Sequence, residues 1–263
     1  MTQLAIHGAA GRMGQRLIAL GHADADLTLA AALEHDQHPA LGTDAGQLAG
    51  VGGLGVPLAH DLGDTRIDVL IDFSLPVGFR RAIALCQDRK IPIVVGTTGL
   101  TAEDEALLDT AAAQIPVLQA TNFSLVVNVL WKLSAQAAQL LEGYDIEILE
   151  AHHNKKKDAP SGTAHTLAQR ICAAAGRDYN KDVIYTRHGD DVERKPNEIT
   201  VQTLRLGDDP GQHTAYFAGP GERLEIKHVS TSRDSYVIGA LKAAKWLVGK
   251  PAGRYAMDDV LGL

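Results

Sequence analysis

The sequence is poor in cysteine, in aromatic residues and in long apolar runs. Its two cysteines, Cys86 and Cys172, are too few for a disulfide framework, so we expect reduced core residues of a cytoplasmic protein. With 5% aromatic residues and a formal net charge of -7, the chain lacks the basic, ring-bearing surface of a nucleic-acid-binding protein. No apolar run approaches the roughly 18 residues of a transmembrane helix, and the N-terminus shows no signal-peptide pattern. We therefore expect neither nucleic-acid nor membrane binding.

The first motif is a strand, a glycine-rich turn and a helix. The expected strand is Leu4 to Ile6, and the turn that follows is Gly8-Ala9-Ala10-Gly11-Arg12-Met13-Gly14. Glycines let such a turn bend sharply, approach a pyrophosphate and bring the helix close to the strand. The spacing is GxxGxxG rather than GxGxxG, and an ordinary strand-to-helix turn is the alternative explanation.

An acidic residue follows at the distance that a dinucleotide site requires. The expected strand Leu27 to Leu33 ends at Glu34, about 20 residues beyond the turn, where a carboxylate accepts hydrogen bonds from the adenosine ribose. A solvated strand end would explain Glu34 alone, but its placement after the glycines favours a dinucleotide site. His35, Asp36 and His38 come next, with no arginine among them to hold a 2′-phosphate. The sequence therefore predicts NADH as the preferred cofactor, or dual use of NADH and NADPH.

The first half alternates strands and helices in the manner of a doubly wound parallel sheet, so the fold class is α/β with a Rossmann-like N-terminal domain. Two polar turns, Gly96-Thr97-Thr98-Gly99 and Ala120-Thr121-Asn122-Phe123-Ser124, stand at the carboxyl ends of strands, where such sheets bind ligands. The expected elements are strands Ile67 to Phe73, Ile91 to Val95 and Val117 to Gln119, and helices Pro76 to Gln87 and Thr101 to Gln114.

After Ser124 the pattern becomes that of a second, α+β domain with a mixed or antiparallel sheet. Its strands are rich in charge, so helices should cover one sheet face and leave the other to a partner chain. From Tyr236 the chain is helical and apolar again and should return to the first domain. We expect a dinucleotide-binding domain of residues 1–124 and 235–263 and a substrate-binding and oligomerisation domain of residues 125–234, with hinges near Ser124 and Asp234. The expected elements are helices Leu125 to Leu141 and Thr163 to Ala175, and strands Asp145 to Ala151, Val183 to Thr186, Ile199 to Leu204, Thr214 to Ala218 and Arg223 to Val229.

The most informative stretch is residues 147–164, EILEAHHNKKKDAPSGTA. Two histidines, His152 and His153, end a strand, and since neighbouring strand residues point to opposite faces, only one of them readily faces a site. Ser161-Gly162-Thr163 can start a helix whose N–H groups and dipole suit a carboxylate. Histidine has the pKa of a general acid near neutral pH, and the lysines attract an anionic substrate.

Other interpretations of this stretch remain open. A lysine run is commonly a solvated loop. The histidine pair lacks the HExxH helix or cysteine cluster of a zinc site, so no metal is expected. In the later turn STSRDS, Arg233 is either a fork for a substrate carboxylate or an exposed loop residue.

These motifs together resemble the 4-hydroxy-tetrahydrodipicolinate reductase (dihydrodipicolinate reductase) family of the diaminopimelate route to lysine, over essentially the whole chain. The resemblance rests on Ile6 to Gly14, Glu34, Gly96 to Gly99, Ala120 to Ser124 and above all Glu147 to Ala164. It implies NAD(P)H-dependent reduction of 4-hydroxy-tetrahydrodipicolinate to tetrahydrodipicolinate with loss of water. It also implies a Rossmann domain closed by the C-terminal helix and a homotetramer formed through the sheet of the second domain.

The resemblance also implies roles for individual residues. His152 and Lys156 would be the catalytic acid groups, and His35 stands where members that use NADPH readily carry an arginine. The cyclic dicarboxylate substrate would be bound by His153, Lys156, Ser161, Gly162, Thr163 and Arg233. The cofactor would be bound at its pyrophosphate by Gly8, Ala9, Ala10, Gly11, Arg12 and Met13, at its ribose by Glu34, and at its nicotinamide half by Gly96, Thr97, Thr98, Ala120, Thr121, Asn122 and Phe123.

Two other functions fit parts of the sequence. Another nicotinamide dehydrogenase, such as an amino-acid dehydrogenase, would keep the glycine turn but has no need of HHNKKKDAPSGT. A non-enzymatic NAD-sensing regulator would bind the cofactor without turnover, but no helix with a basic face suggests DNA binding. An assay of NADH oxidation with hydroxy-tetrahydrodipicolinate separates the three.

Overall fold

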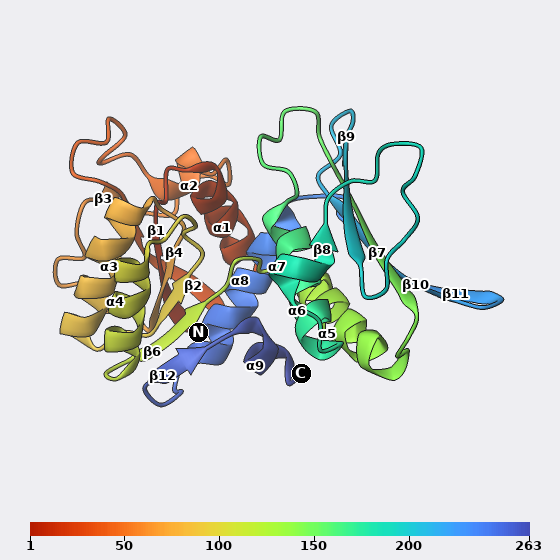
Figure 1. Ribbon diagram of the computed structural model, residues 1–263. Helices are drawn as coiled ribbons and strands as arrows, with labels where there is room; N and C mark the ends of the chain where they lie inside the picture. The colour runs from red at the N-terminus through yellow and green to blue at the C-terminus, as the bar shows by residue number, and fades with distance from the viewer. The chain divides into compact units, whose positions relative to one another are not determined.

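The computed structural model describes residues 1–263, which divide into two compact units (Figure 1). Unit 1 contains residues 1–124 and 234–263, and unit 2 contains residues 125–233. Asp234 lies in unit 1, one residue earlier than the sequence suggested. The reason is local, because its carboxylate accepts two hydrogen bonds from Arg16, at 3.0 and 2.8 Å.

Unit 1 is built on a seven-stranded parallel sheet of order β12-β6-β5-β4-β1-β2-β3. From β1 the chain adds β2 and β3 on one side and β4, β5 and β6 on the other, which is the doubly wound arrangement that the sequence predicts. A crevice therefore forms at the carboxyl ends of β1 and β4, where the strand order reverses. The strands are β1 (Thr2–His7), β2 (Leu27–Leu33), β3 (Leu58–Ala59), β4 (Val69–Asp72), β5 (Ile93–Val95), β6 (Pro116–Gln119) and β12 (Gly253–Tyr255).

Helices cover both faces of this sheet, so its central strands are continuous apolar runs. Helices α1 and α8 pack together, α3 and α4 pack together, and α8 also contacts β4, β5 and β6, as the apolar pattern after Tyr236 predicts. Thr101 and Asp104 form the expected capping box at the start of α4. The helices are α1 (Arg12–His22), α2 (Ala45–Leu48), α3 (Pro76–Arg89), α4 (Ala102–Ala112), α8 (Asp234–Leu247) and α9 (Met257–Leu261).

Unit 2 holds a mixed five-stranded sheet of order β11-β10-β7-β9-β8. Strand β7 is antiparallel to β10 and parallel to β9. Alternate residues of β7, Ile146 and Ile148, face helices α5 and α6 and join their core. The elements are α5 (Leu125–Leu140), β7 (Asp145–His152), α6 (Gly162–Ala174), α7 (Tyr179–Asp182), β8 (Val183–Ile184), β9 (Ile199–Arg205), β10 (Gln212–Gly219) and β11 (Glu222–Val229).

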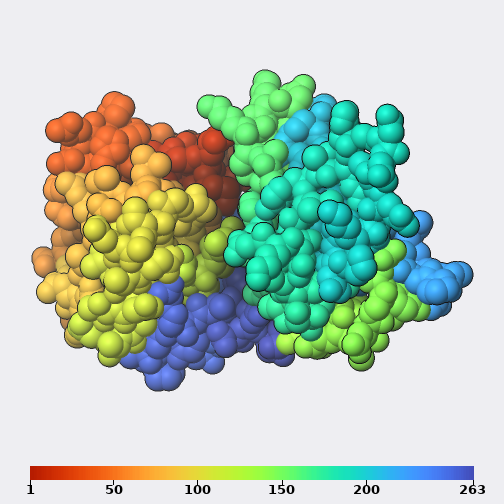
Figure 2. All heavy atoms as spheres, viewed as in Figure 1, coloured from red at the N-terminus to blue at the C-terminus, as the bar shows by residue number.

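The other face of the unit 2 sheet carries two exposed apolar side chains, Val229 on β11 and Leu204 on β9. Val229, Gln212, Ala151 and Leu204 are paired in register across β11, β10, β7 and β9. Val229 and Leu204 remain 48% and 47% exposed. The hairpin of β10 and β11 projects from unit 2, at the right of the view in Figures 1 and 2.

Two differences from the sequence predictions have physical causes. Strand β12 and helix α9 were not expected, because β12 has no apolar alternation. The strand instead pairs with β6 and forms the edge of the sheet, and its Arg254 bonds Asp109, Glu105 and Gln119. Strand β8 is only two residues long, since its pairing with β9 ends at Ile184.

No helix has the length and apolar character needed to cross a bilayer.

Candidate active site

The glycine turn after β1 accepts only glycine at two positions. Gly8 has a φ of +77°, and a Cβ there would lie 2.6 Å from the carbonyl oxygen of Phe73. A Cβ on Gly14 would lie 2.2 Å from the Gly8 carbonyl oxygen. The Gly8 and Ala9 amides donate to the Leu33 carbonyl oxygen at 3.0 and 3.1 Å, which fixes the turn beside β2. The glycines therefore serve the close approach of backbone segments that the sequence indicated.

Helix α1 presents backbone amides rather than a side chain at its start. Its N-cap residue, Gly11, makes no side-chain cap, and Arg12 and Met13 form the first turn. All three line a cavity of about 560 Å³ at the carboxyl edge of the sheet. Amide groups and the positive end of a helix dipole stabilise an anion, so this turn fits the pyrophosphate of a dinucleotide.

Glu34 lines the same cavity from the end of β2. Its Oε2 accepts a hydrogen bond from the Ala10 amide at 3.2 Å, and its Oε1 accepts one from the His35 amide at 3.1 Å. These two bonds hold the carboxylate beside the glycine turn, where it can also accept the hydroxyl groups of a ribose. The residues present therefore fit the adenosine and pyrophosphate part of a nicotinamide dinucleotide.

A second cavity, of about 290 Å³, adjoins the first in unit 1, because Met13 and Phe73 line both. The Phe73 ring packs against Gly96, where a Cβ would come within 2.4 Å of the ring, and lies 5.5 Å from the Phe123 ring. The second cavity brings together six of the seven residues that the family resemblance implies for the nicotinamide half, namely Gly96, Thr98, Ala120, Thr121, Asn122 and Phe123.

The seventh of these residues, Thr97, is buried and makes a structural contact. Its hydroxyl donates to Asp72 Oδ2 at 2.6 Å and accepts from the Ser74 amide at 3.1 Å. Asp72, fully buried at the end of β4, is also 2.7 Å from His7 Nδ1 and accepts the Ser74 hydroxyl at 2.7 Å. This carboxylate ties together the ends of β1 and β4 and the turn after β5, and so sets the shape of the crevice.

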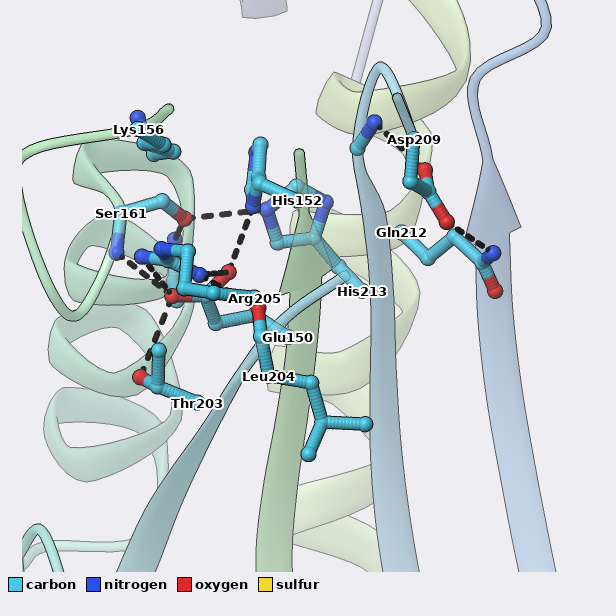
Figure 3. Close-up of polar contacts among 12 residues, drawn as sticks. Glu150, His152, Lys156, Ser161, Thr203, Leu204, Arg205, Asp209, Gln212 and His213 are labelled. Carbon is cyan, nitrogen blue, oxygen red and sulfur yellow. Dashed lines mark hydrogen bonds and ion pairs between the residues drawn. The ribbon is translucent and has the colours of Figure 1, made fainter. Parts of the chain in front are cut away.

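In unit 2 the predicted histidine site is organised around Glu150 (Figure 3). Glu150 has no exposed surface and continues, with His152, the helix-facing side of β7. Its carboxylate lies 2.5 Å from His152 Nδ1 and accepts bonds from Arg205 at 2.9 and 3.0 Å. The Ser161 amide and the Thr203 hydroxyl donate to it at 3.0 and 3.1 Å. Every lone pair of this carboxylate therefore has a partner.

The charge of Glu150 is well defined. Burial opposes its ionisation, but the hydrogen bonds and charges of His152 and Arg205 outweigh burial and lower the pKa of Glu150 to about 2. Glu150 is thus an anion at neutral pH. It fixes the Nδ1 side of the His152 ring, so that Nε2 is the nitrogen left for proton exchange. Nε2 points at Gly211, where an added Cβ would lie only 2.9 Å away.

Two more histidines stand beside this pair. The His213 ring lies edge-on to the His152 ring at 5.2 Å, and its Nε2 is 3.1 Å from the hydroxyl of Ser161. Burial, and then the charges of His152 and His228, lower the pKa of His213 to about 3. Burial, and then His152, also lower the pKa of His228. His213 is therefore neutral at neutral pH and can hold the Ser161 side chain without adding charge to the site.

Ser161 caps helix α6 as the sequence predicts, because its hydroxyl accepts the Ala164 amide at 3.2 Å. Gly162 is exposed in the first turn of this helix, and Thr163, half-buried, accepts the Trp131 indole N–H with its carbonyl at 3.1 Å. The serine therefore joins the Glu150 cluster to a helix start that can receive a carboxylate.

The remaining predicted substrate residues are less constrained. Lys156 is half-buried and pairs with Asp158 at 2.9 Å, and His153 is also half-buried. The other lysines of the run are exposed, in the loop drawn in green at the top of Figure 2. Arg233 is exposed at the end of unit 2, and no hydrogen bond or ion pair joins it to the Glu150 cluster.

Sequence reasoning missed Glu150, Arg205, His213 and His228 as site residues. One signal was available, since Glu150 and His152 alternate on a strand and so share a face. The others reach the site only because β10 and β9 flank β7, which places His213 opposite Glu150 and Arg205 opposite His152. No local sequence pattern predicts that strand order.

Comparison with known proteins gives consistent matches over the whole chain. Two family models match it, described as the N-terminus of dihydrodipicolinate reductase, over residues 2–123, and its C-terminus, over residues 126–261. A 4-hydroxy-tetrahydrodipicolinate reductase of Syntrophotalea carbinolica is 49% identical and one of Geobacter sulfurreducens 47%, each with 100% of both chains covered. A solved dipicolinate-bound dihydrodipicolinate reductase from Paenisporosarcina sp. TG-14 has a TM-score of 0.76 at 24% identity, with 97% of each chain covered. The structural likeness supports the fold.

Proposed function

Since the chain belongs to the dihydrodipicolinate reductase family, as the resemblance in sequence predicts, we propose that it reduces 4-hydroxy-tetrahydrodipicolinate to tetrahydrodipicolinate with NADH or NADPH and releases water. This reaction belongs to the diaminopimelate route to lysine. The observation that carries the proposal is the cluster in unit 2, where a buried carboxylate holds His152 next to the start of α6. The two cavities of unit 1 support the cofactor.

The substrate carries two carboxylates and must lose a hydroxyl group. We assign the carboxylates to Lys156, to the first turn of α6 at Gly162 and Thr163, and to His153 and Arg233. An ammonium group and a helix start both stabilise anions, and the relative that binds dipicolinate holds a planar dicarboxylate of similar size. The reaction is favoured when these charges are neutralised before the chemical step.

The proton is assigned to His152. A bound nicotinamide cofactor would supply hydride, and the departing hydroxyl needs a proton to leave as water. The carboxylate of Glu150 holds the Nδ1 side of the His152 ring, so the ring can exchange a proton through Nε2 from a fixed position. Lys156 is proposed as the second acid group, because its ammonium group carries a positive charge and its side chain is long.

Unit 1 would bind the cofactor through the turn Gly8 to Met13, through Glu34, and through the residues of the second cavity. Ala9, Ala10 and Thr97 line neither cavity, and they would act indirectly by fixing the glycine turn, Glu34 and Asp72 through the hydrogen bonds described above. NADH as the preferred or an equal cofactor stays our prediction. Hydride transfer also requires the two units to close around the substrate, with Ser124 and Asp234 as the proposed hinges.

We further propose a cytoplasmic homotetramer that assembles through the unit 2 sheet. Val229 and Leu204 are exposed on the sheet face opposite the helices, and this face is the surface that a second copy would cover. Light scattering of wild type and of Leu204→Asp tests this assembly. A tetramer that persists in the variant would move the interface elsewhere.

The function is tested by following the oxidation of NADH with freshly generated hydroxy-tetrahydrodipicolinate. His152→Gln is expected to lower kcat by about 10²-fold or more, the usual scale for a lost general acid. The matched control is His188→Gln, which removes an exposed imidazole of the same unit. Normal turnover in His152→Gln would remove His152 from the mechanism, and no turnover in wild type would refute the proposed reaction.

A further inference from the structure

The cavity of about 560 Å³ beside the glycine turn of unit 1 contains an arginine that lies far from Glu34 in the sequence. Arg81 belongs to α3, one helical turn after Gly78, and both residues line the cavity together with Glu34 and His35. The sequence around Glu34 offers no arginine, but the fold brings this one to the same place. Arg12, the other arginine of the lining, lies instead at the start of α1, beside the pyrophosphate turn.

Arg81 makes only one weak ion pair. Its only ion pair is with Asp36, at 3.7 Å between Nη1 and Oδ1, and the two side chains are 61% and 57% exposed. Exposed pairs of this length contribute little to stability, so the guanidinium is available to a stronger anion. Glu34, in contrast, is already fixed by two backbone amides.

We propose that Arg81 binds the 2′-phosphate of NADPH and that Asp36 competes with the phosphate for it. With NADH, Glu34 accepts the ribose hydroxyl groups and Arg81 rests on Asp36. With NADPH, the phosphate replaces Asp36 as the partner of Arg81. The pair Asp36 and Arg81, rather than the residue that follows Glu34, then sets the ratio between the two cofactors. This inference rests on the proposed cofactor site.

Charge balance supports this assignment. Glu34 lines the cavity and Asp36 lies 3.7 Å from Arg81, which also lines it, and these two carboxylates would repel a phosphate that met no cation. A planar guanidinium can bind a phosphate through two parallel hydrogen bonds, whereas Asp36 approaches Arg81 only at 3.7 Å. Arg81 therefore permits NADPH binding in a chain that has His35 in place of the arginine of other family members.

The experiment measures the dissociation constants of NADPH and NADH by nicotinamide fluorescence, and those of 2′,5′-ADP and 5′-AMP by calorimetry. Arg81→Gln is expected to raise the NADPH to NADH ratio of dissociation constants by about tenfold, the scale of a lost charge-assisted hydrogen bond. The ratio for 2′,5′-ADP to 5′-AMP should rise in parallel. Asp36→Asn should lower both ratios, because it frees Arg81.

The matched control is Arg66→Gln, which removes one positive charge three residues before β4, at the opposite edge of the sheet. It should leave both ratios within about twofold of wild type, since exposed charges at that distance are screened. Ratios that do not change in Arg81→Gln, or an equal weakening of both dinucleotides, would overturn this inference alone. A wild-type chain that binds neither dinucleotide would overturn the cofactor site as well. No measurement here depends on turnover.

Discussion

Replacement of Glu150 by glutamine should destabilise unit 2 and disable the histidine beside it. The substitution keeps the shape of the side chain but removes its charge and turns one acceptor oxygen into a donor. That donor would face other donors, because Glu150 accepts five hydrogen bonds and has no exposed surface. Arg205, only 19% exposed, would lose the partner of its buried charge.

The magnitude follows from the pKa of this carboxyl group. The fold lowers the pKa of Glu150 from 4.5 to about 2, against the cost of burial, through His152 and Arg205. At about 1.4 kcal/mol for each pH unit, this difference is worth about 3 kcal/mol of stability at neutral pH. Breaking a buried ion pair from one side usually costs about 3 to 5 kcal/mol, which agrees. We therefore expect Glu150→Gln to lower the free energy of unfolding of unit 2 by about 3 kcal/mol.

The assay can address unit 2 separately. Trp131 is buried in α5 of unit 2, Trp246 is half-buried in α8 of unit 1, and the chain has no other tryptophan. Urea unfolding followed by tryptophan fluorescence in a Trp246→Phe background therefore reports on unit 2. Glu142→Gln, which removes an exposed carboxylate of the same unit, is the control and should change stability by less than about 0.5 kcal/mol.

The pH dependence of the stability difference between wild type and Glu150→Gln tests this reasoning. Because the folded pKa of Glu150 is depressed, its contribution is complete above about pH 4.5 and is lost as the pH falls toward 2. The difference in stability between wild type and Glu150→Gln should accordingly narrow through this window. A loss below about 1 kcal/mol at pH 7, or a difference that stays constant down to pH 2, would refute the reasoning.

Three further changes have defined outcomes. Lys156→Ala should raise KM and lower kcat together in steady-state assays, and an unaffected enzyme would return the lysine run to a solvated loop. The pKa of His213 falls from 6.5 to about 3 on burial, so the unfolded state binds more protons and wild type loses stability as the pH drops from 6.5 to 3. In His213→Asn, the free energy of unfolding measured in urea should fall less steeply over this pH range. An unchanged dependence of the unfolding free energy on pH would contradict this. Gly211→Ala places a Cβ 2.9 Å from His152 Nε2 at a φ of +145°, and should lower kcat by about tenfold or more while calorimetry shows unchanged NADH binding; full turnover would show that the ring tolerates displacement.

Local patterns were sufficient for most of the fold. The period of the apolar residues gave β2 at its observed bounds, and the capping box at Thr101 marked the start of α4. Ser161 could be read as a helix cap because a proline precedes it and a helical pattern follows. The edge strand β12 could not be read, since its stability comes from pairing with β6 and from the Arg254 contacts rather than from its own sequence.

Contacts between distant segments limited the prediction of the site. Arg205 and His213 reach Glu150 and Ser161 across more than fifty residues of sequence, and only the order β10-β7-β9 makes them neighbours. Arg81 joins Glu34 in the same way, through the packing of α3 on the sheet. Sequence reasoning could identify the histidine and the glycine turn because their chemistry is contained in a few consecutive residues.

Unit 1 is built from two segments, residues 1–124 and 234–263, that are separated in sequence by unit 2, and this path constrains the order in which the units can fold on the ribosome. Residues 125–233 form one continuous segment and can fold while residues 234–263 are still inside the exit tunnel. The sheet of unit 1 remains incomplete until β12 and α8 emerge, because until then β6 lacks its partner strand β12 and the sheet face that α8 covers is exposed. A premature stop that removes only residues 234–263 would therefore leave a complete unit 2 joined to an incomplete unit 1, whose exposed apolar surface would promote aggregation.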